Sequence, residues 1–332
     1  MNNSKVSILV TGGAGFIGSV FCSHLKKKYK KLFKIFVIDN LSSGKKKYLN
    51  CDKFYNIDLK NNSKLNNFFK ENKIDIVVHL AGYTNLRDPI AKKFYINNFL
   101  ATKNLIDILI KFNVKKLIFS STAAVYGNLA TIPINEHSVT KPISHYGRSK
   151  LKAENYIKKK FQDNYQSVIF RFFNASGAST IHKIGEDKDP PEHLLPIILR
   201  GFLKRKQIKI FNNFETPDGT GIRDYVHVED IAIALTKSIN HFKKMKENFT
   251  ILNLGSGRGV SSLFIVKKLQ TLLKKKIDFL FMQKRIGEPN ILLSSIKKAQ
   301  KEINWSPINS VNKILKDSIF WESYINNNKK KF

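Results

Sequence analysis

TGGAGFIG, the stretch from Thr11 to Gly18, follows an apolar run at 6–10 and opens a longer amphipathic segment. Its glycines at 13, 15 and 18 form the pattern G-x-G-x-x-G, which is typical of a dinucleotide-binding loop when it lies between a strand and a helix. Glycine there permits a tight turn, lets backbone amides approach a pyrophosphate and lets the helix pack closely on the strand. The N-terminus of the helix favours the anion. We therefore expect a dinucleotide-binding unit at the start of the chain.

A carboxylate at the end of the next strand indicates which dinucleotide binds. The apolar run 34–38 ends at Asp39, 21 residues after Gly18. A carboxylate at this place accepts hydrogen bonds from the adenosine ribose hydroxyls and repels a 2′-phosphate, so the sequence favours NAD over NADP. Asp58 follows the third strand, where it either meets the adenine or simply caps the strand.

Short apolar runs alternate with amphipathic segments through the first half of the chain, which indicates strands separated by helices. This order predicts an α/β fold, a doubly wound parallel sheet of the Rossmann type, with a second, smaller mixed α/β substrate domain. We assign 1–180, with a returning segment at about 227–256, to the NAD-binding domain, and 181–226 and 257–332 to the substrate domain. The expected strands are 6–10, 34–38, 53–57, 74–80, 116–119 and 168–172, and helices are expected at 194–204 and 228–239.

Composition narrows the function classes. The chain of 332 residues carries a formal charge of +33, but only eight of its 58 basic residues are Arg, which indicates lysine on solvated helix faces. No aromatic-basic stripe of the RNA-binding type is present, so no nucleic-acid partner is expected. Two cysteines, Cys22 and Cys51, and the absence of metal-ligand spacing predict no disulfide framework and no metal. Without a signal peptide or an apolar stretch of membrane length, we expect a cytoplasmic protein with no membrane partner.

A second motif carries the chemistry. Tyr146 and Lys150 are four residues apart, after a plausible helix N-cap at Ser144, so their side chains share one face of a helix. A nearby ammonium and the positive nicotinamide ring both favour the phenolate form, so we expect Lys150 and the cofactor together to move the pKa of Tyr146 toward neutral pH. Thr122 lies at the end of the fifth strand, where sites form in parallel sheets. It is the candidate partner for a substrate hydroxyl.

Together these motifs resemble the extended short-chain dehydrogenase/reductase family. The resemblance rests on TGGAGFIG, SSTAAVYG at 120–127, Y-x-x-x-K at 146–150 and RFFN at 171–174. TPDGTGIRDYVHV at 216–228 is similar to the substrate-domain signature of UDP-glucose 4-epimerases. The resemblance implies that Tyr146 takes the proton of the C4 hydroxyl of a UDP-hexose while NAD⁺ takes the C4 hydride. The 4-keto sugar then turns and receives the hydride on its other face.

The resemblance also implies site residues and a homodimer, with the helices near 90–112 and 145–162 in contact. Tyr146, Lys150 and Thr122 are the catalytic set. The implied cofactor contacts are Gly12, Gly13, Gly15, Phe16, Ile17, Gly18, Asp39, Asn40, Asp58, Leu59, Leu80, Ala81, Gly82, Thr84, Asn97, Tyr146, Lys150 and Phe173. The implied UDP-sugar contacts are Thr122, Asn174, His193, Leu194, Phe211, Arg223, Arg285 and Glu288. Arg223 and Arg285 are the expected diphosphate partners, although Arg223 could instead form an ion pair with Asp224 or another carboxylate.

Three departures from the common pattern stand out: Thr84 in place of a lysine, Glu288 in place of an aspartate, and 303–305, INW, in place of LGW. The first could shift a cofactor contact to Arg87. Nucleotide-sugar dehydratases and decarboxylases are the nearest rivals, and they carry an acidic residue where this chain has Ala123 and Ala124. A 4-epimerase of UDP-N-acetylhexosamine or UDP-glucuronate stays open, and a non-catalytic NAD-binding scaffold is disfavoured by the intact catalytic set.

Overall fold

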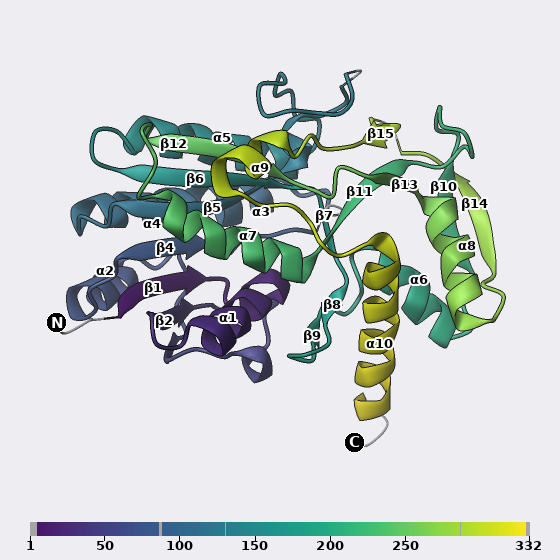
Figure 1. The fold of residues 1–332 in the computed structure, drawn as a ribbon, viewed down its shortest axis with the longest axis horizontal. Helices are drawn as coiled ribbons and strands as arrows, with labels where there is room; N and C mark the ends of the chain where they lie inside the picture. The colour runs from purple at the N-terminus through teal and green to yellow at the C-terminus, as the bar shows by residue number, and fades with distance from the viewer. Residues whose placement is uncertain (1–4, 86–87, 130, 286, 330–332) are drawn as a thin grey trace.

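Seven parallel strands form the main sheet of the computed structural model, which describes residues 5–85, 88–129, 131–285 and 287–329 (Figure 1). The spatial order is β12-β6-β5-β4-β1-β2-β3. The chain runs outward from β1 to β3, then returns to the other side of β1 and continues from β4 to β12. This reversal creates a crevice at the carboxyl ends of β1 and β4, the usual ligand site in such sheets. The strands are β1 (Val6–Thr11), β2 (Phe33–Ile38), β3 (Lys53–Tyr55), β4 (Ile76–His79), β5 (Lys116–Thr122), β6 (Gln166–Phe172) and β12 (Phe249–Leu254).

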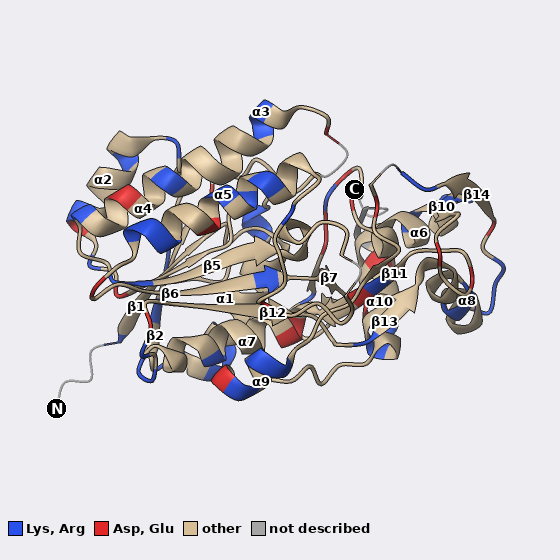
Figure 2. Cartoon of the chain, turned by 90° about the horizontal axis from the view of Figure 1, so that it is seen from above, with Lys and Arg blue, Asp and Glu red and all other residues tan. Residues whose placement is uncertain are grey.

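Helices cover both faces of this sheet because successive strand side chains alternate between its faces (Figure 2). Ile8 and Val10 of β1 pack with α1 and α7, whereas Leu9 packs with α2, α4 and α5. Two apolar cores result, one on each face. The helices are α1 (Phe16–Tyr29), α2 (Asn62–Glu71), α3 (Ala91–Phe94), α4 (Ala101–Lys111), α5 (His145–Lys160), α7 (Val228–His241) and α9 (Lys297–Ile303), with 3₁₀ turns η1 (Lys46–Tyr48) and η3 (Ala123–Val125) and a π-helical segment η2 (Tyr95–Leu100).

A smaller lobe lies beyond the carboxyl edge of the sheet (Figure 1). Its core contains Leu195 and Ile198 of α6, Ile265 of α8 and Leu315 of α10. Strand β11 joins the lobes, since it pairs with β7 at one end and with β13 and β15 at the other. The elements are β7 (Asn174–Ser176), β8 (Ala178–Ser179), β9 (Ile184–Gly185), α6 (Leu194–Leu203), β10 (Ile208–Asn212), β11 (Ile222–His227), β13 (Gly259–Ser261), α8 (Ser262–Leu273), β14 (Phe279–Gln283), β15 (Ile291–Leu292) and α10 (Val311–Lys329).

The predicted α/β class and parallel sheet are confirmed, with two corrections of detail. The stretch 174–192, where no strand is predicted above, contains the short strands β7, β8 and β9. The tail from 326, where no helix is predicted above, is helical to Lys329, because Ile325 of α10 is buried against Trp321 and Ala178. Within the described residues no helix is long and apolar enough to cross a membrane. The same residues contain no group of His, Cys, Asp and Glu that could hold a metal ion.

A buried ion pair fixes α5 to the sheet. Arg171 of β6 donates from Nη2 to Glu154 Oε2 at 2.8 Å and from Nε to Glu154 Oε1 at 3.1 Å. The two side chains are 3% and 0% exposed. Ser121 of β5 also donates to Glu154. The helix that carries Tyr146 and Lys150 is thereby held against the ends of β5 and β6.

We predict that Glu154→Gln lowers the free energy of unfolding by about 3 kcal/mol or more, because it leaves the Arg171 charge buried without its counter-ion. Denaturant unfolding measures the change. Glu71→Gln, an exposed substitution on α2, is the matched control and should change stability by less than about 0.5 kcal/mol. A loss below about 1 kcal/mol in the Glu154 variant would contradict a stabilising role for the pair.

Candidate active site

Three adjoining cavities follow the carboxyl edge of the main sheet. We call them the dinucleotide cavity, about 1000 Å³, the central cavity, about 260 Å³, and the outer cavity, about 250 Å³. Gly12, Gly15 and Gly82 line both the dinucleotide and central cavities, whereas Asn174 and His193 line both the central and outer cavities. A continuous path therefore leads from the glycine loop into the smaller lobe.

The structure brings nearly all the predicted site residues to this path. The dinucleotide cavity is lined by Gly12, Gly15, Asp39, Asn40, Asp58, Leu59, Leu80, Ala81, Gly82, Thr84 and Asn97. The central cavity is lined by Phe16, Ile17, Gly18, Thr122, Tyr146, Lys150, Phe173, Asn174 and His193 in addition to five of those residues, namely Gly12, Gly15, Leu80, Gly82 and Thr84. The outer cavity is lined by Leu194, Phe211, Arg223, Arg285 and Glu288. Gly13 is the exception, since it lines none of the three.

The glycines of the loop do different work. Gly12 has φ +72°, and a Cβ there would lie 2.6 Å from the backbone nitrogen of Ala81, so the segments that follow β1 and β4 approach too closely here for a side chain to fit. A Cβ at Gly18 would lie 2.3 Å from Gly12 O, which places α1 directly on the loop. A Cβ at Gly13 would lie 2.6 Å from Val37 Cγ1. Gly13 is thus a packing position against β2.

Asp39 closes the loop from the side. Its Oδ2 accepts from Ala14 N at 3.0 Å and its Oδ1 from Leu41 N at 2.8 Å. Burial raises the pKa of this carboxyl, and the two backbone amides oppose that rise. Beside it, Asn40 donates to Asp58 Oδ2 at 3.0 Å. These contacts fix the direction of two carboxylates that line the dinucleotide cavity.

Helix α5 presents Tyr146 and Lys150 to the central cavity. The predicted cap is confirmed, since Ser144 Oγ accepts from Gly147 N at 3.0 Å. A Cβ at Gly147 would lie 2.4 Å from Ala124 O, so this glycine lets the first turn of α5 pack on η3. Ala124 N in turn donates to Thr122 Oγ1 at 3.1 Å. The hydroxyl of Thr122 and the phenol of Tyr146 are brought together by this close packing.

Of the two groups expected to lower the pKa of Tyr146, Lys150 does not do so in the structure, so that part of the expectation is wrong. Burial raises the pKa of Tyr146 to about 12, and the group that opposes the rise is the Thr122 hydroxyl, through a hydrogen bond. The ammonium of Lys150 is directed elsewhere: it donates to Ser120 O at 2.8 Å and lies 4.9 Å from the centre of the Phe119 ring. Burial lowers the pKa of Lys150 to about 8, against the opposing charge of Glu154.

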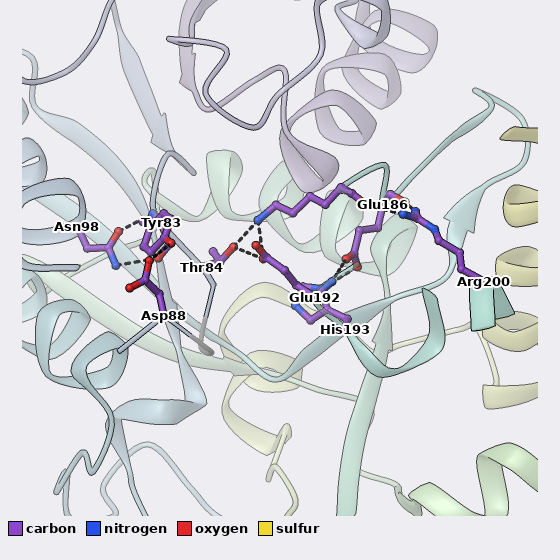
Figure 3. Close-up of polar contacts among 9 residues, drawn as sticks. Tyr83, Thr84, Asp88, Asn98, Glu186, Glu192, His193 and Arg200 are labelled. Carbon is purple, nitrogen blue, oxygen red and sulfur yellow. Dashed lines mark hydrogen bonds and ion pairs between the residues drawn. The ribbon is translucent and has the colours of Figure 1, made fainter. Parts of the chain in front are cut away.

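Sequence reasoning missed residues that hold this site in place. Asn98, buried in the π-helical segment η2, accepts from Tyr83 N at 2.6 Å and donates to Tyr83 O at 3.0 Å and Ser149 Oγ at 3.1 Å. It links the loop after β4 to α5. Figure 3 shows the two contacts of Asn98 with Tyr83. A Cβ at Gly82 would lie 3.2 Å from both Asn98 Oδ1 and Lys150 Nζ. In the sequence, the only local feature that points to this role is the pair of adjacent asparagines, Asn97 and Asn98.

The outer cavity contains two guanidinium groups. Arg223 forms an ion pair with Glu288, with Nη2 2.9 Å from Oε1. The ion pair considered above as an alternative role for this arginine therefore exists, and its partner is Glu288 rather than Asp224. Arg285 stacks over Phe211, 4.5 Å from the ring centre. His193 Nδ1 lies 2.6 Å from Glu186 Oε2. Desolvation lowers the pKa of this histidine, but the negative charge of Glu186 raises it by more, so the pKa lies above its ordinary value.

Thr84 contacts the smaller lobe. Its Oγ1 is 2.7 Å from Lys188 Nζ and 3.2 Å from Glu192 Oε2. Arg87, named above as a substitute cofactor contact, lies outside the described residues. Lys188 and Glu192 were not singled out from the sequence, since their contacts with Thr84 span more than one hundred positions.

Comparison with known proteins shows which family has this fold and these motifs. A model of the NAD dependent epimerase/dehydratase family matches residues 8–255. A UDP-glucose 4-epimerase of Streptococcus mutans is 36% identical, over 96% of this chain and 97% of its own length. The chain belongs to the NAD dependent epimerase/dehydratase family. Within that family it is an NAD-dependent nucleotide-sugar 4-epimerase.

Two solved structures give the same result at the level of the fold. UDP-glucose 4-epimerase from Bifidobacterium longum, in complex with NAD⁺ and UDP, is 31% identical with a TM-score of 0.91, covering 97% of this chain and 99% of that one. The UDP-Glc/GlcNAc 4-epimerase from Campylobacter jejuni is also 31% identical, with a TM-score of 0.82 and 96% and 99% coverage. The cofactor of this family member is NAD. Two features of the glycine loop fit a bound dinucleotide. There is no room for a side chain at Gly12, and the carboxylate of Asp39 is fixed beside the loop by Ala14 N.

The Thr122 contact yields a prediction on pH dependence. Because a hydroxyl that donates to the phenolate lowers the pKa of Tyr146, Thr122→Val should raise that pKa and move the alkaline rise of turnover to higher pH. Turnover at neutral pH should fall about tenfold or more. The pH profile of kcat measures both. Thr122→Ser keeps the hydroxyl and should keep the wild-type profile; an unshifted profile in the valine variant would remove Thr122 from the proton chemistry.

Proposed function

We propose that this enzyme interconverts UDP-glucose and UDP-galactose by inverting C4 of the hexose. The observation that carries the proposal is the central cavity, where Tyr146, Thr122 and Lys150 stand between the glycine loop and the cavity of Arg223 and Arg285. A sugar held there by its nucleotide handle has a proton acceptor beside it. The dinucleotide lies on the other side.

The roles we assign follow from the contacts. NAD⁺, when bound in the dinucleotide cavity, would supply the hydride acceptor for C4 and the hydride donor for the return step, and its positive ring would favour the phenolate form of Tyr146. Tyr146 Oη takes the proton of the C4 hydroxyl in the first half of the cycle and gives it back in the second. Thr122 donates to the phenolate and orients it. Lys150, held by Ser120 O, adds positive charge on the same face.

Substrate anchoring belongs to the outer cavity. We assign the diphosphate to Arg223 and Arg285, whose forked guanidinium groups match phosphate oxygens. Arg223 would exchange its ion pair with Glu288 for the phosphate or share it. We keep the predicted domain assignment as part of the proposal: 1–180 with 227–256 forms the NAD-binding domain and 181–226 with 257–332 the substrate domain. The exception is α9 with Trp305, which packs in the core of the main sheet.

Elimination chemistry has less support. Turn η3 carries Ala123 and Ala124 directly after Thr122, so it offers no acid or base there.

We also propose a homodimer through α3, η2, α4 and α5, where Ile90 and Tyr95 are 48% and 41% exposed. Light scattering of the purified protein measures the oligomeric state, and a monomer at micromolar concentration would contradict this part of the proposal.

The assay that tests the function mixes the purified enzyme separately with UDP-galactose, UDP-N-acetylgalactosamine and UDP-galacturonate and follows the C4 epimers by nuclear magnetic resonance. We expect the fastest conversion with UDP-galactose. Preferential conversion of the N-acetylated or uronic sugar would establish that alternative instead. No conversion of any of the three by enzyme that contains NAD would refute the proposal.

Tyr146→Phe tests the assigned proton acceptor. It should lower kcat at least about 100-fold because general base catalysis is lost, while NAD remains bound. Tyr156→Phe is the matched control: it lies on the same helix, and its hydroxyl contacts Asp107 rather than the central cavity. Equal activity of the two variants would assign the proton transfer to another group.

A further inference from the structure

One segment of the smaller lobe forms a wall of the NAD site. Residues 186–192 connect β9 to α6, and they line the dinucleotide cavity from 187 to 192 and the central cavity from 186 to 188. The opposite walls are the glycine loop and the ends of β1 and β4. We call residues 186–192 the strap.

A first tether joins the strap to the NAD-binding side of the molecule. Asp187 Oδ2 lies 2.7 Å from Lys45 Nζ and accepts from Tyr48 Oη at 2.7 Å. The side chain of Asp187 is 5% exposed and that of Lys45 is 40% exposed, so the carboxylate is removed from water while the lysine stays partly solvated. Lys45 N in turn donates to Ala14 O at 3.0 Å, within the glycine loop. The strap is therefore connected to the loop that receives the pyrophosphate.

A second tether joins the strap to the end of β4. Lys188 Nζ donates to Thr84 Oγ1 and to Glu192 Oε2, each at 2.7 Å. Figure 3 shows Thr84, Glu192 and His193 in one connected run of polar contacts that continues to Glu186. Thr84 lines all three cavities, so this tether crosses the path between cofactor and substrate.

The backbone of the strap is held from behind. Arg200 of α6 donates to Glu186 O at 2.8 Å and also to Lys188 O, and Trp321 Nε1 of α10 donates to Glu186 O at 3.0 Å. Arg200 also pairs with Glu322 at 2.8 Å. These contacts give the strap a fixed shape on the smaller lobe, so that its tethers are the contacts that would have to break for the cavity to open.

One atom of the first tether has no partner. Asp187 Oδ1 is buried and has no hydrogen-bond partner among the described residues. A buried carboxylate oxygen without a donor costs free energy. This cost partly offsets the contacts that the other oxygen of Asp187 makes with Lys45 and Tyr48.

We propose that the strap retains NAD: its two tethers, Asp187 with Lys45 and Tyr48, and Lys188 with Thr84, must open before the cofactor leaves. Retention serves the reaction, because loss of the reduced cofactor midway strands the 4-keto sugar. The inference rests on the NAD site proposed above and adds to it the residues that control cofactor release.

The test measures the rate at which radiolabelled NAD leaves the loaded enzyme when excess unlabelled NAD is added, so it does not depend on turnover. Lys188→Met and Asp187→Asn should each speed release about tenfold or more, since each removes a charge-assisted contact. Tyr48→Phe, which removes one neutral donor and keeps the ring on Trp321, should speed release about threefold. Lys46→Met, at an exposed position on the same turn as Tyr48, should release NAD at the wild-type rate.

The outcomes separate the strap from the site itself. Wild-type enzyme that holds NAD, with release unchanged in the Lys188, Asp187 and Tyr48 variants, overturns the strap and leaves the proposed NAD site standing. Wild-type enzyme that holds no NAD overturns the site and the strap together. If one charge variant fails to fold, as judged by its thermal transition, the conservative Tyr48→Phe variant decides: faster release supports the strap and wild-type release overturns it.

Discussion

The carboxyl ends of β1 and β4 approach so closely at Gly12 that no side chain fits between them, and the rest of the site depends on this approach. A Cβ there would lie 2.6 Å from Ala81 N. The contact fixes the glycine loop at the crevice where the strand order reverses, and α1 begins directly above it. A larger residue would force apart the segments that follow β1 and β4, where Leu80 and Ala81 line the dinucleotide cavity.

Burial sets the chemistry of the groups around that crevice. The same desolvation raises the pKa of Tyr146 to about 12 and lowers that of Lys150 to about 8, because it disfavours the charged form of each. Thr122 opposes the first shift and Glu154 the second. The carboxylate of Glu154 therefore has two effects, since it also holds Arg171 and anchors the catalytic helix. Stability and reactivity share one buried network.

The two lobes are joined by more than the strand β11. The strap brings charged side chains from the smaller lobe to the loop at 45–48 and to Thr84, and it carries Glu186, the partner of His193. Cofactor and substrate cavities consequently share a wall. The Lys and Arg positions coloured blue along the ribbon in Figure 2 occur in the helices on both sides of the main sheet, so the positively charged residues are not confined to this wall.

The sequence by itself determined the α/β class, the parallel strands and the cap at Ser144, because strand alternation, helix periodicity and cap chemistry are local. It also identified Gly12, Asp39, Tyr146 and Lys150 as candidates, since short motifs carry them. It could not determine what Lys150 touches, and its expected effect on Tyr146 was wrong: the ammonium donates to Ser120 O, thirty positions earlier. Asn98, the Arg223 pair with Glu288 and the strap were decided by tertiary structure alone. Their partners are distant in sequence, and which charges become neighbours depends on how the lobes pack.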